Sequence, residues 1–345
     1  MIEIDGGQKS GSGTILRLSV AFAAIMGEPL HICNIRQNRP QPGLKPQHLE
    51  AVLTAARLCN AELQGATINS RELWFKPEKV KSGKIEAEIG TAGSIPMLLL
   101  TVLPICAVAE SAVQLHVLRG GTDVSYSPTI NYLRFVLLPT LGRMGLNSSL
   151  TVQKYGYYPK GMGEATLTVQ PCKTLNPLRS ETFGNIRLLK GISVCTFLAN
   201  RRVAERQADA ASNYLKERGY TTSIQIVNDQ SNPLQKGSSI TLWAETDNGI
   251  ILGADATGEL RKTSETVGVE AAEKLYGEIS AQPTIDAHLA DMLIPYTALA
   301  RGSSVYLVRT ISEHLETNIW LAEKMLNVRF RTERMGALFR VEKIG

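Results

Sequence analysis

Residues 284–320 have the sequence TIDAHLADMLIPYTALARGSSVYLVRTISEHLETNIW and contain two of the chain's five histidines. Apolar residues recur every three or four positions from Asp286 to Ala300, which predicts a helix there. His288 and Asp291 are three residues apart on that helix and therefore share one face. A Gly-Ser turn and a strand at Val305 to Arg309 are expected to follow. The stretch thus predicts an imidazole and a carboxylate side by side on a helix that packs next to a strand.

The second histidine of this stretch, His314, precedes another predicted helix. Thr317 and Asn318 are both good N-cap residues, so we expect a helix to begin there and to run through Met325. Free backbone amides and the helix dipole at such an N-terminus favour an anion. A histidine that faces a phosphate-sized site is a candidate nucleophile or acid–base group. A single histidine in a globular chain is more often structural, so the position alone leaves both alternatives open.

The composition is that of an ordinary globular protein, with 43% hydrophobic and 20% charged residues. A length of 345 residues is enough for two domains, or for one large domain with an insert. The net charge of +5 suits a polyanionic partner without requiring one.

Three further features bear on the cellular compartment. The N-terminal sequence MIEIDGGQ does not resemble a secretory signal. The longest apolar run, Ile95 to Ala109, is interrupted by prolines and is short for a bilayer span, so we expect a buried helix. The five cysteines are scattered and form no CxxC pair, which is typical of reduced thiols and excludes a cysteine-bound zinc site. These features predict a cytoplasmic protein without a membrane span.

Strand and helix patterns alternate along the chain in an order that recurs. The predicted helices outside the insert are Thr14 to Met26, Gln47 to Ala61, Ile95 to Ala109, Ile130 to Met144, Asp286 to Ala300 and Thr317 to Met325. The predicted strands are Met1 to Asp5, Pro29 to Arg36, Leu73 to Lys76, Ile85 to Ile89, Val113 to Leu118, Leu150 to Lys154, Ala165 to Val169, Val305 to Arg309, Val328 to Thr332 and Leu338 to Val341. The order strand, helix, strand, helix, strand, strand predicts three units of an α+β fold, the third beginning with the helix at Asp286.

Extra material lies between the second and third units, from about Gly184 to Ala281. Its predicted strands are Gly191 to Leu198, Thr222 to Ile226, Ile240 to Glu245 and Ile250 to Ala254, and its predicted helices are Ala204 to Arg218 and Ser264 to Ile279. We interpret this segment as a small inserted α/β domain that shapes the substrate site or contacts a partner.

Seven segments, in this order along the chain, resemble the RNA 3'-terminal phosphate cyclase family. They are IDGGQKSGSGTILR (Ile4 to Arg17), IRQNRPQPGLKPQHLEAV (Ile35 to Val52), GTAGS (Gly90 to Ser94), GGTD (Gly120 to Asp123), YGYYPKGMGE (Tyr155 to Glu164), HLADMLIPYTALA (His288 to Ala300) and EHLETNIW (Glu313 to Trp320). The resemblance covers essentially the whole chain, and several blocks in the right order are a far more specific signal than any single block.

The resemblance implies a fold of three βαβαββ repeats around a pseudo-threefold core, as in enolpyruvyl transferases, with a smaller inserted α/β domain. It assigns residues 1–183 and 282–345 to a three-repeat catalytic domain and residues 184–281 to the insert. It also implies the activity, which is ATP-dependent conversion of an RNA 3'-terminal phosphate into a 2',3'-cyclic phosphodiester. The expected substrates are therefore ATP and RNA with a 3'-terminal phosphate, together with a divalent metal, Mg or Mn.

By the same resemblance, His314 is the residue that attacks the α-phosphorus of ATP and carries AMP. An imidazole has a reference pKa of about 6.5 and is mostly neutral and nucleophilic at pH 7. The residues implied to grip the RNA phosphate are Arg17, Arg36, Arg39 and Gln47, and guanidinium groups suit that task because they bind phosphate oxygens bidentately. The residues implied to bind ATP are His288, Leu289, Ala290, Asp291, Met292 and Pro128.

The chain also departs from the family pattern. Ser10 stands where the family usually has a glutamate implicated in metal binding, so the metal ligands stay unassigned. Leu100 and Met292 stand where the family has glutamines near the nucleotide, and Thr14 also replaces a glutamine. Met162 stands where the family often has glycine. These changes concern the contacts to ATP and metal more than the reaction class.

Two other functions stay open at this point. One is a non-catalytic RNA-binding factor of the same fold that acts in ribosome assembly, although such relatives lack the histidine nucleophile. The other is an enolpyruvyl transferase, which fold similarity alone suggests and which has no role for an adenylated histidine.

Overall fold

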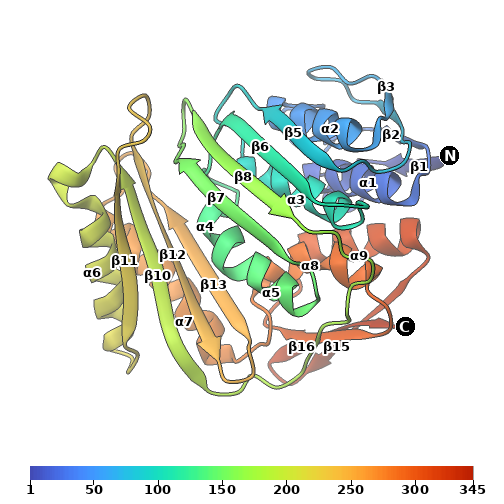
Figure 1. Cartoon of the computed structure of the whole chain (residues 1–345). Helices are drawn as coiled ribbons and strands as arrows, with labels where there is room; N and C mark the ends of the chain where they lie inside the picture. The colour runs from blue at the N-terminus through green and yellow to red at the C-terminus, as the bar shows by residue number, and fades with distance from the viewer. Residues whose placement is uncertain (345) are drawn as a thin grey trace.

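The computed structural model describes residues 1–344, whose strands form four sheets of four strands each (Figure 1). The helices are α1 (Gly13–Met26), α2 (Pro46–Cys59), α3 (Ile95–Ala107), α4 (Ile130–Tyr132), a π-helical stretch (Leu133–Leu137), α5 (Leu138–Arg143), a 3₁₀ turn (Ala199–Arg201), α6 (Val203–Lys216), α7 (Ser264–Ala281), α8 (Ala287–Leu299) and α9 (Glu313–Leu326). The strands are β1 (Ile2–Asp5), β2 (Leu30–Cys33), β3 (Glu62–Gln64), β4 (Leu73–Lys76), β5 (Gly83–Glu88), β6 (Val113–Gly120), β7 (Ser148–Lys154), β8 (Gly163–Val169), β9 (Arg179–Ser180), β10 (Ile186–Thr196), β11 (Thr222–Asp229), β12 (Gly237–Thr246), β13 (Ile251–Thr257), β14 (Ser304–Val308), β15 (Arg329–Met335) and β16 (Leu338–Ile344). The prediction of a mixed α+β protein is confirmed.

Three of the sheets are connected in the same way. In the first, β1 runs parallel to β2, and β2 and β3 both pair antiparallel with β4. In the second, β5 runs parallel to β6, and β6 and β7 both pair antiparallel with β8. In the third, β9 runs parallel to β14, and β14 and β15 both pair antiparallel with β16. The fourth sheet has the order β11-β10-β12-β13 and belongs to the segment predicted as an insert.

The third sheet corrects one feature of the prediction. We expected the third unit to begin with a helix at Asp286, after the inserted segment. Its first strand is instead β9, which precedes that segment and pairs Arg179 with Val305 and Ser180 with Tyr306. Two residues are too few to show a strand periodicity, which is why the sequence did not reveal β9. The fourth sheet is therefore inserted within the third unit and not before it.

Most helix boundaries follow local capping chemistry. Ser12 caps α1 by accepting a hydrogen bond from the backbone N–H of Thr14, and Gly27, with φ 68°, ends that helix. Asp286 caps α8 by accepting from the N–H groups of His288 and Leu289. Strand β2 is shorter than predicted, ending at Cys33, because the backbone turns at Asn34, where φ is 51°.

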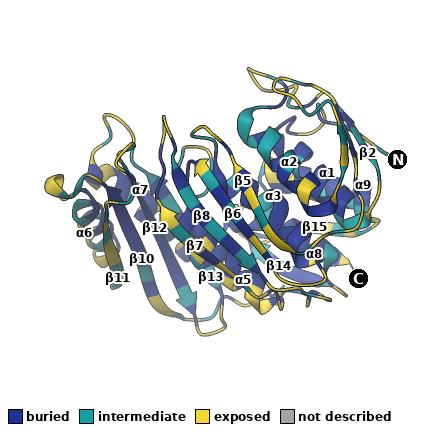
Figure 2. Cartoon of the chain, turned by 45° about the horizontal axis from the view of Figure 1, so that its top comes forward, coloured by how far each residue is buried: buried dark blue, intermediate teal, exposed yellow. Residues whose placement is uncertain are grey.

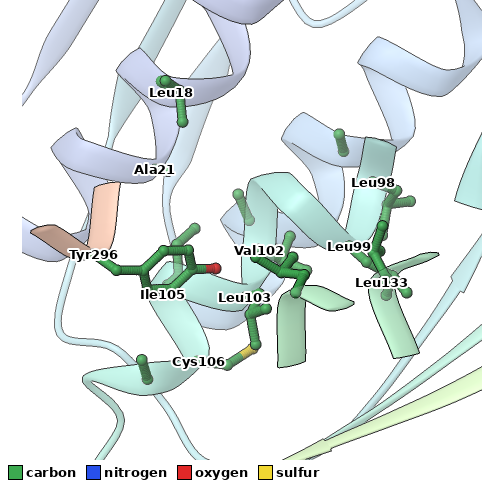
Figure 3. Packing of buried hydrophobic residues seen from close by; sticks show 14 of the residues in the cluster. Leu18, Ala21, Leu98, Leu99, Val102, Leu103, Ile105, Cys106, Leu133 and Tyr296 are labelled. Carbon is green, nitrogen blue, oxygen red and sulfur yellow. The ribbon is translucent and has the colours of Figure 1, made fainter. Parts of the chain in front are cut away.

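The largest hydrophobic core surrounds α3, as expected for the apolar run that begins at Ile95. Figure 3 shows side chains of α3 packed with Leu18 and Ala21 of α1, with Leu133, and with Tyr296 of α8. In residues 1–344 no helix is both long and apolar enough to cross a membrane. All five cysteines are free thiols.

The inserted segment has a second core between its sheet and the helices α6 and α7. Figure 2 shows β10 and β12, the central strands of that sheet, as mostly buried. The segment also packs against the rest of the molecule, since Trp243 of β12 stacks on Phe135 with ring centroids 4.7 Å apart. In Figure 1 it stands at the end of the molecule opposite the two termini.

Candidate active site

A cavity of about 570 Å³ lies where α1, α3, α8 and α9 meet the inserted segment. It brings together many of the residues singled out from the sequence, which are Arg17, Pro128, His288, Asp291, Met292 and His314. A volume of this size fits one small organic ligand, since such pockets commonly measure ~300–1,000 Å³. Residues that are 297 positions apart in the chain, Arg17 and His314, thus face the same space.

His314 lies in the first turn of α9, and this corrects the predicted helix start. The helix begins at Glu313 because Ser312 accepts a hydrogen bond from the N–H of Leu315 at 3.0 Å. Thr317 and Asn318, the residues expected to cap the helix, lie inside it. His314 is still at the N-terminal end, where the helix dipole favours anions and disfavours a charged imidazole. Its side chain is exposed at the cavity.

Side-chain hydrogen bonds from α8 and α1 fix the start of α9. Ser312 donates to Asp291, Oγ to Oδ1 at 2.7 Å, and the Asn318 amide donates to the carbonyl oxygen of Asp291 at 2.9 Å. Thr14 of α1 donates to Asn318, Oγ1 to Oδ1 at 3.0 Å. Burial raises the pKa of the Asp291 carboxyl to about 6. The position of His314 is therefore set by three helices together.

Arg17 lines the cavity with His314, and two further arginines, Arg36 and Arg39, lie near Arg17 but are not among the lining residues. Arg17 is half-buried, and burial together with Arg36 and Arg39 lowers its pKa to about 10. Among residues 1–344, no carboxylate contributes to the charges that act on Arg17, so no acid of this part of the chain relieves the repulsion within the group. Three neighbouring guanidinium groups of this kind are suited to bind a phosphate, because an anion relieves their repulsion.

The loop that carries two of these arginines is held in one conformation. Arg36 has φ 57° and donates Nη1 hydrogen bonds to the carbonyls of Gln41, at 2.7 Å, and Gly43, at 2.9 Å. Gly43 has φ 80°, and a Cβ there would lie 2.3 Å from the Asn69 carbonyl oxygen, so only glycine fits. Arg39 is exposed on this loop. Arg36, in contrast, uses Nη1 for the two hydrogen bonds that hold the loop.

His314 lies within the electrostatic reach of this group. Partial desolvation by the surrounding cavity walls lowers the pKa of His314 most, and the charges of Arg17 and Arg39 lower it further, with a weaker opposing effect from Glu313. The imidazole is therefore kept neutral below its ordinary titration range. A neutral, exposed imidazole next to unpaired guanidinium groups can act as a nucleophile toward a phosphorus atom whose oxygens those cations hold.

His48 also lies in this region, close to Arg17. Its side chain is only 5% exposed, and its Nδ1 has no hydrogen-bond partner within residues 1–344. Burial, with Arg17, Arg36 and Lys45, lowers its pKa to about 2, so the ring is neutral. A Cβ at Gly13 would lie 2.4 Å from His48 Nε2 and 2.9 Å from Arg17 Nη1, so the missing side chain there lets both pack against α1.

Not all predicted site residues face the cavity. Gln47 is absent from its walls, and its Oε1 accepts a hydrogen bond from the N–H of Ser94 at 2.8 Å, which ties α2 to the loop before α3. Leu289 and Ala290 were expected at the nucleotide, but both are fully buried in the core and do not line the cavity. Their direction follows from the helix period, since the residues of α8 that line the cavity are His288, Asp291, Met292 and Pro295, three or four positions apart.

The remaining predicted contacts lie together on one wall. His288 is exposed in the first turn of α8, and its ring meets the edge of Tyr132 with centroids 6.4 Å apart. Met292 and Pro128 line the same cavity, together with Leu100. Two of the positions that depart from the family pattern, Leu100 and Met292, thus make this wall apolar.

The inserted segment supplies one wall of the cavity, through residues that the sequence did not single out. Asp255 and Thr257 come from the end of β13, and Lys262, Glu270 and Lys274 come from the start of α7 and the loop before it. Lys274 bridges Glu270, at 2.9 Å, and the backbone carbonyl of Asp255, at 3.0 Å. Charged residues four apart on a helix usually form a solvated face, so their spacing gave no sign of a site.

Metal binding has little support from protein side chains alone. Within residues 1–344 no group of three or more His, Cys, Asp or Glu side chains could hold an ion. Ser10, where the family usually has a glutamate, is buried with its Oγ 3.0 Å from Ser12 Oγ.

Comparison with known proteins shows the family to which the chain belongs. The family model described as RNA 3'-terminal phosphate cyclase matches residues 8–332. Proteins named RNA 3'-terminal phosphate cyclase are similar along almost the whole chain. The one from Pyrobaculum neutrophilum is 42% identical over 344 residues, covering 100% of this chain and 98% of that protein. The one from Methanopyrus kandleri is 44% identical over 332 residues, covering 95% of this chain and 94% of that protein. This chain belongs to the RNA 3'-terminal phosphate cyclase family.

Proposed function

We propose that this chain uses ATP to convert an RNA 3'-terminal phosphate into a 2',3'-cyclic phosphodiester, with His314 as the nucleophile. The observation that carries the proposal is that His314 is exposed in a nucleotide-sized cavity shared with Arg17. Its pKa is lowered by burial and by Arg17 and Arg39, so the imidazole is available as a neutral nucleophile. Membership of the cyclase family supports the same reaction.

Three substitutions at phosphorus make up the reaction. An imidazole nitrogen of His314 attacks the α-phosphorus of ATP, and pyrophosphate leaves. An oxygen of the RNA 3'-phosphate then attacks the phosphorus of the histidine-bound AMP, which frees the imidazole and forms an RNA adenylate. The neighbouring ribose 2'-hydroxyl finally attacks the activated 3'-phosphorus, losing its proton to solvent, and AMP leaves. A covalent intermediate of this kind divides one difficult step into easier ones.

We assign the phosphates to the arginine side of the cavity. Arg17 offers a guanidinium group on which no carboxylate of residues 1–344 acts, Arg39 lies near it, and Arg36 holds the loop that presents Arg39. Gln47 acts indirectly in this assignment, because its amide oxygen is engaged by Ser94. Positioning of this kind supplies most of what phosphoryl transfer needs from a protein.

We assign the nucleoside part of ATP to the wall formed by His288, Met292 and Pro128. An aromatic ring and apolar side chains suit the flat face of a base. Asp291 lines the same cavity, and its carboxylate also holds the start of the helix that carries His314. Leu289 and Ala290 contribute to the packing of α8 and not to the ligand.

A divalent ion, Mg or Mn, belongs to the proposal as a companion of ATP. Because the described chain offers no cluster of three ligands, phosphate oxygens and water have to supply most of the coordination, as Mg²⁺ tolerates well. The ion, when bound, neutralises part of the phosphate charge.

We further infer the architecture that the resemblance implies, with three βαβαββ repeats around a pseudo-threefold core. The shared connection pattern of three sheets supports it. The second hydrophobic core, which runs from Phe183 to Ile279, supports residues 184–281 as the inserted domain and residues 1–183 with 282–345 as the catalytic domain. Free cysteines support a cytoplasmic location.

The test is conversion of a 3'-phosphorylated oligoribonucleotide into a phosphatase-resistant end in the presence of ATP and Mg²⁺ or Mn²⁺. We expect conversion by the intact protein and none by His314→Ala. His116→Ala is the matched control, because His116 pairs with Glu164 on the second sheet and does not line the cavity. A protein that binds the RNA but never protects its end, under either metal, would instead be the non-catalytic assembly factor.

A further inference from the structure

Two loops meet at the rim of the cavity, one before α4 and one between β13 and α7. Ser125 donates a hydrogen bond to Glu259, Oγ to Oε1 at 3.0 Å, and joins them. Each loop exposes a large apolar side chain next to that bond, Tyr126 at 102% and Leu260 at 98%. In residues 1–344 no other large hydrophobic side chain is as exposed, the next being Tyr158 at 78%. Exposed apolar groups gathered at one place usually mark a binding surface.

The backbone of both loops is held in an unfavourable conformation. Tyr126 has φ 62° and Arg261 has φ 70°, in the left-handed region that bulky side chains seldom adopt. A tyrosine held there without burying its ring gains little for folding, and such strain commonly persists at ligand sites. Tyr126 also lines the cavity, and a side chain that lines it while remaining fully exposed lies on its rim.

The size of the cavity indicates which ligand reaches that rim. A volume of about 570 Å³ accommodates roughly one nucleotide. ATP can therefore lie inside, whereas an RNA chain that presents its terminal phosphate to Arg17 must extend outward past the rim. Proteins that hold single-stranded RNA stack its bases on exposed aromatic rings and place cations beside them. Arg261 and Lys262 follow Leu260 directly and supply such cations on the same loop.

We propose that Tyr126, flanked by Leu260, stacks on a nucleobase near the 3' end of the substrate RNA, outside the cavity that holds ATP. The inference rests on the proposed function, because it needs RNA with a 3'-phosphate as the ligand. It assigns the rim of the inserted segment to the RNA and gives that segment a part in substrate binding.

The test uses a 3'-phosphorylated oligoribonucleotide with 2-aminopurine at its last or penultimate position, without ATP. Stacking on Tyr126 quenches the probe, and Tyr126→Ala is expected to remove the quenching and weaken binding about tenfold, equivalent to about 1.4 kcal/mol. Tyr126→Phe keeps the aromatic ring and should retain both the quenching and the RNA affinity. Leu260→Ala should give a smaller loss. Leu234→Ala, at an exposed leucine that does not line the cavity, is the control and should change neither.

Unchanged affinity and quenching in Tyr126→Ala would overturn the inference. So would a higher KM for ATP in histidine adenylylation with RNA affinity intact, since the ring would then serve the nucleotide. Failure of the proposed function looks different. The wild-type protein would then show no preference for a 3'-phosphate over a 3'-hydroxyl end and no label from ATP, and the inference would fall with it.

Discussion

Asp291 on α8 accepts a hydrogen bond from Ser312, Oγ to Oδ1 at 2.7 Å, and Ser312 is the residue that caps α9. The same hydroxyl accepts from the N–H of Leu315, so one serine both begins the helix of His314 and ties it to its neighbour. This relationship gives Asp291 a positioning role that its place in the sequence did not reveal. The cap at Ser312 is therefore one of the contacts that hold the helix of the proposed nucleophile in place.

Ser312→Ala should therefore lower both stability and the rate of histidine adenylylation. Loss of an N-cap costs about 1 kcal/mol, and in a protein of this size that lowers Tm by roughly 2–4 °C. The rate should fall about tenfold or more, because a first turn that frays no longer holds His314. Thr263→Ala is the control, since Thr263 caps α7 in the same way. Equal rates in the two variants would contradict the positioning role.

Replacing Arg39 should shift the acid side of the pH profile of histidine adenylylation. Arg39 is one of the cations that lower the pKa of His314, and a lowered pKa keeps the nucleophile neutral at more acidic pH. Removing the charge in Arg39→Gln raises that pKa, so the acid side of the profile should move to higher pH. Single-turnover rates between pH 5 and 8 measure it, with Arg119→Gln as control, because Arg119 pairs with Glu88 elsewhere on the surface. If the acid side of the pH–rate profile did not move, the charge of Arg39 would not affect the pKa of His314.

Arg17→Lys should weaken binding of 3'-phosphorylated RNA at least tenfold, about 1.4 kcal/mol or more. A lysine cannot offer two parallel donors to a phosphate. The burial and the neighbouring cations that lower the pKa of Arg17 to about 10 would also depress the charge of an amine there. Fluorescence anisotropy with labelled RNA measures the change. Arg119→Lys is the control and should bind the RNA like the wild-type protein. If Arg17→Lys also bound it like wild type, Arg17 would not contact the RNA phosphate.

The stability of the fold should fall as pH rises through the titration of Asp123. Its carboxyl is 2% exposed, and burial raises its pKa to about 7 despite hydrogen bonds from Thr122 and from the N–H of Ile130. Between about pH 4 and 7 the folded state then holds more protons than the unfolded state, so stability declines by up to about 1.4 kcal/mol per pH unit. Urea unfolding at pH 4.5 and 7.5 should show a smaller decline in Asp123→Asn. Asp209→Asn, on the exposed face of α6, should leave the decline unchanged.

Sequence patterns located the elements whose side chains face a core. The apolar run from Ile95 predicted α3, and the period from Asp286 predicted α8 to within a residue at each end. The start of α9 was wrong because Thr317 and Asn318 use their side chains elsewhere. Thr317 donates back to the carbonyl of Glu313, and Asn318 donates to Asp291 on another helix. Good N-cap residues carry no information about tertiary partners.

The candidate site could be predicted only in part. Without the resemblance to a family, nothing in the spacing of Arg17 and His314 says that they share a cavity. The insert was interpreted as a domain that shapes the substrate site or contacts a partner, but its cavity residues were not predicted, since Lys274 and Glu270 form an ordinary i,i+4 pair on α7. Which face of such a helix meets a ligand depends on how the insert packs against the rest of the chain.

The most direct test of the account is covalent labelling. The protein is incubated with ATP carrying a labelled α-phosphate and a divalent metal, denatured in alkali and separated from free nucleotide. The account predicts label on the wild-type chain that acid removes, as expected for a phosphoramidate, and none on His314→Ala, while His116→Ala is labelled normally. Acid-stable label, or label that survives in His314→Ala, would contradict the central role of this imidazole.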